Sequence, residues 1–156
     1  MVDQNMEQRN NTSLLNIFVS ELMKDGKKSL VQKHVQKALD CVHKELNMTE
    51  SDVIEGLVKR LFYPFTLTSK RVGRYILKVP SPISKEKATR RVFKFITHSV
   101  KFNKNAKGIL KSKRRGIPLH EKLSKEIIKT VRGNSISCTR MQEYRSISES
   151  NKAFMR

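Results

Sequence analysis

Six basic or titratable side chains recur at helical spacing between residues 87 and 101: Lys87, Arg90, Arg91, Lys94, His98 and Lys101. Helical residues three and four positions apart share a face, so this spacing places all six in one stripe. Apolar side chains occupy the opposite side, as in a helix packed on a core: Ala88, Val92, Phe95, Ile96 and Val100. Like charges at these spacings repel one another unless an anion lies across them. The chemistry that this stripe indicates is the binding of phosphate groups.

A second basic group precedes the stripe, at the tip of a predicted β-hairpin. Apolar residues alternate with polar ones over about residues 65–79, which is the period of a pair of strands. Gly73 can take a positive φ angle between the two strands, and it is flanked by Lys70, Arg71 and Arg74. Two strands alone are marginally stable in water, so we expect the hairpin to rest on helices at its base.

Six helices are expected around this hairpin, three before it and three after it, which makes the predicted fold class mainly α. They are expected at about residues 12–24, 29–46, 49–63, 84–102, 118–132 and 137–150. Ser29 and Gln32 have the spacing of a capping box at the start of the second helix. Pro80 and Pro82 are expected to end the pairing of the second strand. On the sixth helix the residues expected to face inward are Met141, Tyr144 and Ile147.

The charge of the chain is concentrated in one part of it. The formal net charge is +19, from 33 Lys and Arg against 14 Asp and Glu. Residues 1–62 hold nine basic and nine acidic residues, whereas residues 63–156 hold 24 and 5. Part of this excess lies in a basic connector at about residues 103–118. A field of this size opposes compaction and favours a polyanionic partner.

The remaining composition argues against several other classes of protein. Cys41 and Cys138 are far apart and form no metal-binding motif, and no apolar run is long enough to span a bilayer. His120 and Glu121 begin like a zinc-protease motif, but the second histidine is missing. We therefore expect no catalysis, no cofactor and no membrane contact. From the residues alone, a DNA-compacting or other architectural nucleic-acid-binding protein stays open beside an RNA-binding one.

Four short segments, in this order and at this spacing, resemble the S seven family of small-subunit ribosomal proteins. They are Met23 to Ser29, Ser69 to Gly73, Val79-Pro80 and Asn151 to Phe154. The resemblance covers about residues 13–154. It implies a six-helix domain with a protruding hairpin between the third and fourth helices. It also implies that the chain binds the 3′ major domain of the small-subunit rRNA and so nucleates the head of the subunit.

The resemblance further implies particular neighbours and contacts. The hairpin would lie near messenger RNA and the exit-site tRNA, and the domain would contact ribosomal protein S eleven and other proteins of the head. Carried over by position, the resemblance implies RNA contacts at Lys27, Lys28, Ser29, Lys70, Arg71, Gly73, Lys87 and Lys94. The basic residues of the same half of the chain extend the expected contacts to Arg74, Arg90, Arg91, Lys101, Lys111, Lys113, Arg114, Arg115, Arg140 and Lys152.

The polar start of the chain predicts a flexible tail at residues 1–12, and residues 13–156 are expected to form a single RNA-binding domain.

Departures from the bacterial members of the family suggest where the chain works. The N-terminal stretch carries Asp3 and Glu7 where those members have a basic arm, and the chain stops soon after Phe154. These departures, together with a sequence rich in Lys, Asn and Ile, are typical of a member encoded in a mitochondrial genome. The expected location is the small ribosomal subunit of the mitochondrial matrix, and a plastid or the bacterial cytoplasm is the alternative.

Overall fold

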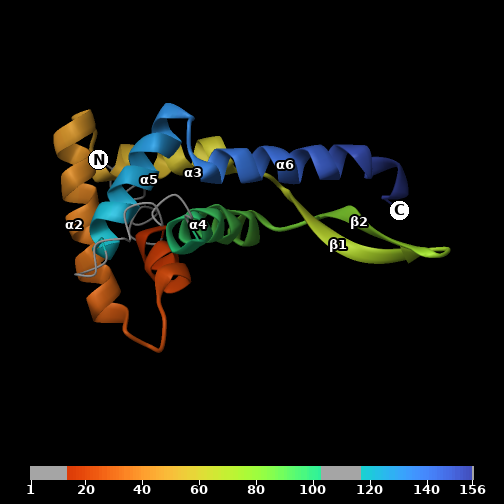
Figure 1. Cartoon of the computed structure of the whole chain (residues 1–156), viewed down its shortest axis with the longest axis horizontal. Coiled ribbons are helices and arrows are strands. Elements are labelled where there is room, and N and C mark those ends of the chain that lie inside the picture. The colour runs from red at the N-terminus through yellow and green to blue at the C-terminus, as the bar shows by residue number, and fades with distance from the viewer. Residues whose placement is uncertain (1–13, 103–116, 156) are drawn as a thin grey trace, which may run out of the picture.

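The computed structural model describes residues 14–102 and 117–155, and it confirms the predicted mainly helical fold. Six helices and a two-stranded antiparallel hairpin make up the structure, and the hairpin comes between the third and fourth helices in the chain and extends away from the helical body (Figure 1). A helix at residues 14–22 is followed by α2 (Lys28–Leu46), α3 (Glu50–Leu61), β1 (Phe65–Val72), β2 (Tyr75–Pro82), α4 (Lys85–Phe102), α5 (Leu119–Arg132), α6 (Ile136–Ser150) and a short 3-10 helix, η2 (Lys152–Phe154). The expected tail at residues 1–12 and most of the basic connector lie outside the described residues.

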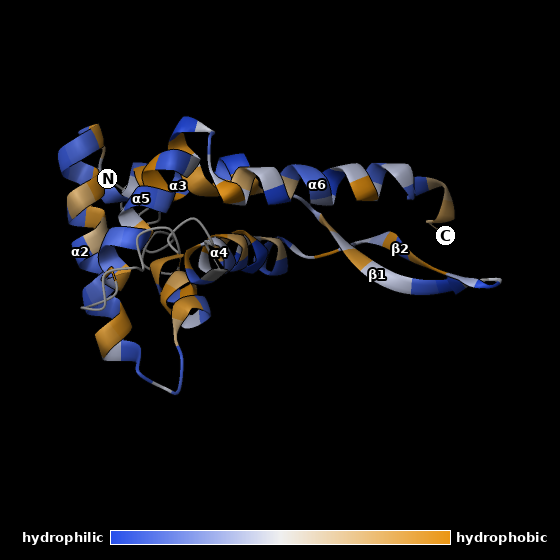
Figure 2. Ribbon diagram, viewed as in Figure 1, coloured by the Kyte–Doolittle hydropathy of each residue, from blue (hydrophilic) through white to orange (hydrophobic). Residues whose placement is uncertain are grey.

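One cluster of buried apolar side chains joins the helices into a body. It includes Phe18 from the first helix and Phe93 from α4, whose rings stack with centroids 4.9 Å apart. Hydrophobic residues lie mainly on this body and at the root of the hairpin, whereas the hairpin tip is hydrophilic (Figure 2). The predicted place of Phe95 in the core of α4 is wrong, because Phe93 is fully buried and Phe95 is only half-buried. Since α4 packs against α3, α5 and α6 together, its buried face is wider than one stripe.

The start of α2 differs from the predicted capping box. Asp25 and Gly26 both adopt left-handed conformations, with φ of 54° and 71°, and the helix begins directly afterwards at Lys28. Lys27 takes the N-cap position without a side-chain hydrogen bond, so the capping box of Ser29 is wrong. The tight turn brings the carbonyl of Lys27 into position to accept the hydrogen bond from Val31 N, and this starts the helix earlier than the sequence motif indicates.

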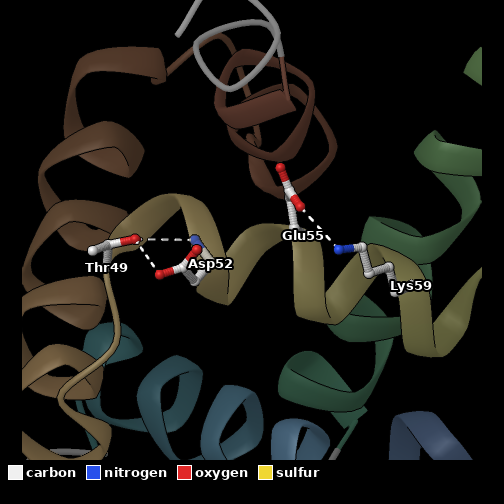
Figure 3. A network of polar contacts seen from close by, with 4 residues as sticks. All are labelled: Thr49, Asp52, Glu55 and Lys59. Carbon is white, nitrogen blue, oxygen red and sulfur yellow. Dashed lines mark hydrogen bonds and ion pairs between the residues drawn. The ribbon is translucent and has the colours of Figure 1, made fainter. Parts of the chain in front are cut away.

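The start of α3 agrees with prediction. The Thr49 hydroxyl accepts a hydrogen bond from the backbone N–H of Asp52 and donates to the Asp52 carboxylate at 2.7 Å (Figure 3). This is the arrangement of a side-chain N-cap, which satisfies one of the free N–H groups of the first turn. One turn further, Glu55 and Lys59 form an exposed ion pair with an N–O distance of 3.1 Å.

The hairpin is longer than predicted, because β2 stays paired through both of its prolines. Leu67 lies opposite Pro80, and Phe65 lies opposite Pro82. A strand of a two-stranded ribbon has one free edge, and residues two apart turn their backbone nitrogens to the same edge. Pro80 and Pro82 can thus both face the free edge, where no donor is needed. The expectation that they end the pairing is therefore wrong.

The two C-terminal helices are fixed by polar contacts between elements. The buried Glu126 of α5 accepts hydrogen bonds from Ser137 N at 3.2 Å and Ser137 Oγ at 2.7 Å, in the first turn of α6. Gly133 ends α5 in a left-handed conformation, with φ of 93°. The helix α6 then runs beside the hairpin and contacts both of its strands (Figure 1). The predicted inward position of Ile147 on α6 is wrong, because Ile147 is 39% exposed.

Candidate nucleic-acid interface

The cations predicted on α4 form an exposed row on that helix. Lys87, Arg90, Lys94 and Lys101 are all exposed, on the side away from the buried residues of the core. The ion pair found among the described residues joins Lys59 to Glu55. No carboxylate in the described part of the chain therefore pairs with any of the four cations of the α4 row. The row is therefore available to a negatively charged ligand.

Arg91 belongs to the same predicted stripe, but the structure uses its guanidinium to join three elements. It donates to the carbonyl of Phe65 at 3.1 Å and to Thr66 Oγ1 at 2.5 Å, both on β1, and to the hydroxyl of Tyr144 on α6. The central guanidinium carbon of Arg91, Cζ, also lies 5.3 Å from the centre of the Tyr144 ring, which is within cation–π distance. Arg91 therefore anchors the hairpin to α4 and α6, and a contact with RNA remains a prediction for this residue.

Arg140 lies across from the α4 row and contacts it. Its guanidinium donates to Nδ1 of His98, which joins α6 to α4. Arg140 is half-buried, and this contact places the predicted RNA-binding residue at the junction of α4 and α6.

The hairpin tip carries its predicted cations in the open. Lys70, Arg71 and Arg74 are exposed, and Gly73 turns the chain with φ of 61°. Tyr75 is also exposed, at 74%, although it belongs to the alternating apolar residues that predicted the strand pair, and its neighbour Ile76 is 73% exposed. The alternation could not show that the hairpin projects past the helical body (Figure 1). An exposed tyrosine beside arginines adds a surface on which a base can stack.

The turn before α2 brings together the third predicted group, Lys27, Lys28 and Ser29, all of them exposed. The first turn of α2 has no side-chain cap and no acidic residue. Lysines at a helix N-terminus are unfavourable next to the positive end of the helix dipole, and a bound anion would reverse this effect. The exposed lysines and the uncapped helix N-terminus are thus two features that favour a bound anion.

The other predicted contacts divide between the C-terminus and the connector. Lys152 is exposed in η2, close to the hairpin, since Asn151 donates to the carbonyl of Lys78 at 3.0 Å. A second row of basic residues lies on α5, with Lys125, Lys129 and Arg132 exposed. The predicted contacts at Lys111, Lys113, Arg114 and Arg115 lie outside the described residues.

The described residues contain no cluster of three or more His, Cys, Asp or Glu side chains that could hold a metal ion. Over the same parts of the chain, no helix has the length and apolarity needed to cross a bilayer. What the described surface offers is a set of cations distributed over α2, the hairpin, α4, α5 and α6.

Comparison with known proteins decides between the classes of basic protein. A family profile described as ribosomal protein S7p/S5e matches residues 2–152. The chain belongs to this ribosomal protein family. A protein of Neorickettsia sennetsu named small ribosomal subunit protein uS7 is 23% identical over 148 residues, covering 95% of this chain and 78% of the relative. Proteins with the same name from Herpetosiphon aurantiacus and Dictyoglomus turgidum are each 24% identical over 144 residues, which cover 92% of this chain and 85% of each relative.

Membership of the S7p/S5e family confirms the resemblance drawn from the four short segments. The family consists of ribosomal proteins and not of enzymes, which agrees with the expectation of no catalysis. In this ribosomal protein, sequence reasoning missed the part taken by Tyr144, whose hydroxyl accepts hydrogen bonds from Leu67 N at 2.6 Å and from Arg91. The one signal in the sequence was its inward position on the sixth helix.

Proposed function

We propose that this S7p/S5e protein is a structural component of the small ribosomal subunit that binds the 3′ major domain of the rRNA and organises the head. The observation that carries the proposal is the exposed row of Lys87, Arg90, Lys94 and Lys101 on α4, in a chain that belongs to this family. The mechanism is electrostatic: each lysine or arginine that meets a phosphate releases condensed counterions. Backbone and shape are read more than base sequence, because the major groove of an RNA duplex is too narrow for side chains.

The neighbours follow from the same proposal. The projecting hairpin, with Arg71, Arg74 and Tyr75 exposed at its tip, is suited to reach messenger RNA and the exit-site tRNA. Ribosomal protein S eleven and other proteins of the head are the proposed protein partners. The composition rich in Lys, Asn and Ile favours a mitochondrial ribosome, with a plastid or bacterial ribosome as the alternative. Detection of the native protein in small subunits from fractionated organelles and cytosol distinguishes these compartments.

The test removes three charges from α4 and compares the result with removal of three charges elsewhere. The variant Lys87→Gln/Arg90→Gln/Lys94→Gln changes exposed residues of the row. Its matched control changes three exposed lysines of α2, in the part of the chain with no net charge: Lys33→Gln/Lys37→Gln/Lys44→Gln. Affinity for a 3′ major domain rRNA fragment is measured over a range of salt concentrations. Arg91 is left unchanged, because it anchors the hairpin.

We expect the α4 variant to bind more weakly and to lose roughly one unit of salt slope for each phosphate contact removed. The α2 variant should bind nearly as tightly as the unmodified protein. Equal losses in both variants would show that net charge alone acts, which contradicts a specific face. A duplex DNA of similar length binding as tightly as the rRNA fragment would favour the architectural DNA-binding alternative.

A further inference from the structure

A cavity of about 490 Å³ lies between the hairpin, α4 and α6. The phosphate-binding role proposed for the exposed cations does not explain why this cavity is present. Its volume falls within the range of roughly 300–1,000 Å³ in which small-ligand sites are found. It opens beside the α4 row, since Lys94 lines it as well. Figure 1 shows the elements that form it: the hairpin and α6 extend from the helical body in the same direction.

The inner wall of this cavity is rigid before any ligand arrives. Tyr144 and Thr66 both line the cavity, and their hydroxyl groups accept hydrogen bonds from the guanidinium of Arg91. The Leu67 N–H donates a further hydrogen bond to the Tyr144 hydroxyl. The ring of Phe95 also lines the cavity and meets the Tyr144 ring edge-on, with centroids 5.7 Å apart and planes at 74°. Fixed aromatic rings and a fixed guanidinium form a surface that loses little freedom when a flat group packs on it.

The rest of the lining is cationic and hydroxylated. Lys78 from β2 and Lys94 from α4 are exposed, and within the described residues neither has a carboxylate partner. Arg140 completes the basic lining, against the single carboxylate of Glu143. The ligand that fits this combination carries a negative charge and an apolar planar group on the same small unit. A bare phosphate would leave the aromatic wall unused, and a base-paired duplex could not enter.

We propose that this cavity receives one unstacked nucleotide of an RNA, with its base against Phe95 and Tyr144 and its phosphate toward Lys78 and Lys94. This inference rests on the proposed function and adds to it a site for a single extruded base. Unpaired bases that stack on aromatic or arginine side chains are the usual way in which proteins read folded RNA. The bound nucleotide would fix the protein in one position on an RNA whose phosphates it otherwise contacts without regard to sequence.

The first experiment uses the free protein and nucleoside monophosphates. The four 5′-monophosphates and, separately, inorganic phosphate are titrated while NMR follows the ring protons of Phe95 and Tyr144 and the amide of Leu67. We expect saturable shifts at all three residues with at least one monophosphate and no comparable ring shifts with phosphate. Ring shifts that are the same with phosphate alone, or absent with all four monophosphates, would overturn the inference.

The second experiment changes the cavity without changing charge. Phe95→Leu removes an aromatic ring, and Ile147→Trp fills the cavity from α6, where Ile147 lines it and is 39% exposed. Phe154→Leu is the control, since Phe154 is an exposed phenylalanine outside the lining. Amide exchange at Leu67 shows in each variant whether the hairpin is still docked.

Both cavity variants should weaken binding to the rRNA fragment by roughly five-fold or more. Their salt slope should fall by no more than about one unit, which is the phosphate contact of the excluded nucleotide, because the cations of the rows are unchanged. The control should bind like the unmodified protein. Undiminished affinity in both cavity variants, with the hairpin docked, overturns the inference but leaves the proposed function intact. Failure of the unmodified protein to bind the fragment counts against the proposed function, whereas the monophosphate titration still tests the cavity by itself.

Discussion

Replacing Arg91 by lysine should loosen the hairpin while the charge of the chain stays the same. The guanidinium reaches the Phe65 carbonyl, Thr66 Oγ1 and the Tyr144 hydroxyl at once, because its donors are spread over a rigid planar fork. A lysine carries its donors on a single nitrogen and cannot satisfy acceptors on β1 and α6 in the same way. Arg91→Lys therefore changes geometry alone, and Arg91→Met removes both geometry and charge.

The size of the effect follows from the contacts that are lost. Hydrogen bonds from a charged donor contribute about 1.5–3 kcal/mol each, and a cation–π contact at a partly exposed site adds about 0.5–1 kcal/mol. These contacts belong to one network, so their sum overstates the loss. We expect Arg91→Met to destabilise the docked hairpin by about 2–3 kcal/mol and Arg91→Lys to destabilise it by about 1–2 kcal/mol. The loss expected for Arg91→Met corresponds to a rise of roughly 30- to 140-fold in the population of undocked hairpin.

Amide hydrogen exchange at Leu67 measures this docking directly, because its N–H donates to the Tyr144 hydroxyl at 2.6 Å. Exchange at Leu67 should accelerate in both Arg91 variants, while buried amides of α2 such as that of Val35 keep their protection. Arg90→Gln is the matched control, since the neighbouring arginine is exposed. Exchange at Leu67 that is unchanged in Arg91→Lys, or equally fast in Arg90→Gln, would refute the reasoning.

Two further substitutions test contacts within the helical body by urea unfolding. Gly133→Ala should cost about 1–3 kcal/mol, because φ is 93° and the new Cβ would lie 2.8 Å from a guanidinium nitrogen of Arg60; a stability equal to the parent would contradict this. Glu126→Ala should cost about 1–3 kcal/mol, because it deprives the buried Ser137 N–H and hydroxyl of their acceptor. Glu121→Ala, an exposed change on the same helix, should leave the urea midpoint nearly unaltered, and equal losses in both would argue against the capping of α6 by Glu126.

The elements of the fold could be predicted because they depend on local patterns. The apolar period placed all six helices, and α5 ends at a glycine, Gly133, that takes the left-handed conformation. The capping box at Ser29 failed because the neighbouring turn fixed the helix start first. Phe93 and Phe95 could not be separated by periodicity, since α4 is buried against three other helices.

The candidate site was predicted only as far as charge and spacing reach. The exposed cations of α4 and of the hairpin tip follow from their positions in a helix and a turn. The anchoring part of Arg91 does not, because its partners Phe65, Thr66 and Tyr144 lie 25 to 53 positions away in the sequence. The cavity between the hairpin, α4 and α6 depends on the same long-range packing, so no local sequence motif predicts it.

Charge and hydrophobic packing divide this chain in different ways. The charge changes at about residue 63, yet the buried cluster takes Phe18 and Leu39 from the neutral part and Phe93 and Ile127 from the basic part. Apolar contacts across the boundary therefore hold together a half of the chain whose surface repels itself. Because this stabilisation does not require salt bridges, the cations of α4 and the hairpin tip can stay exposed in the free protein. An anion then meets a surface already in place, and the ordering cost of binding is small for these elements.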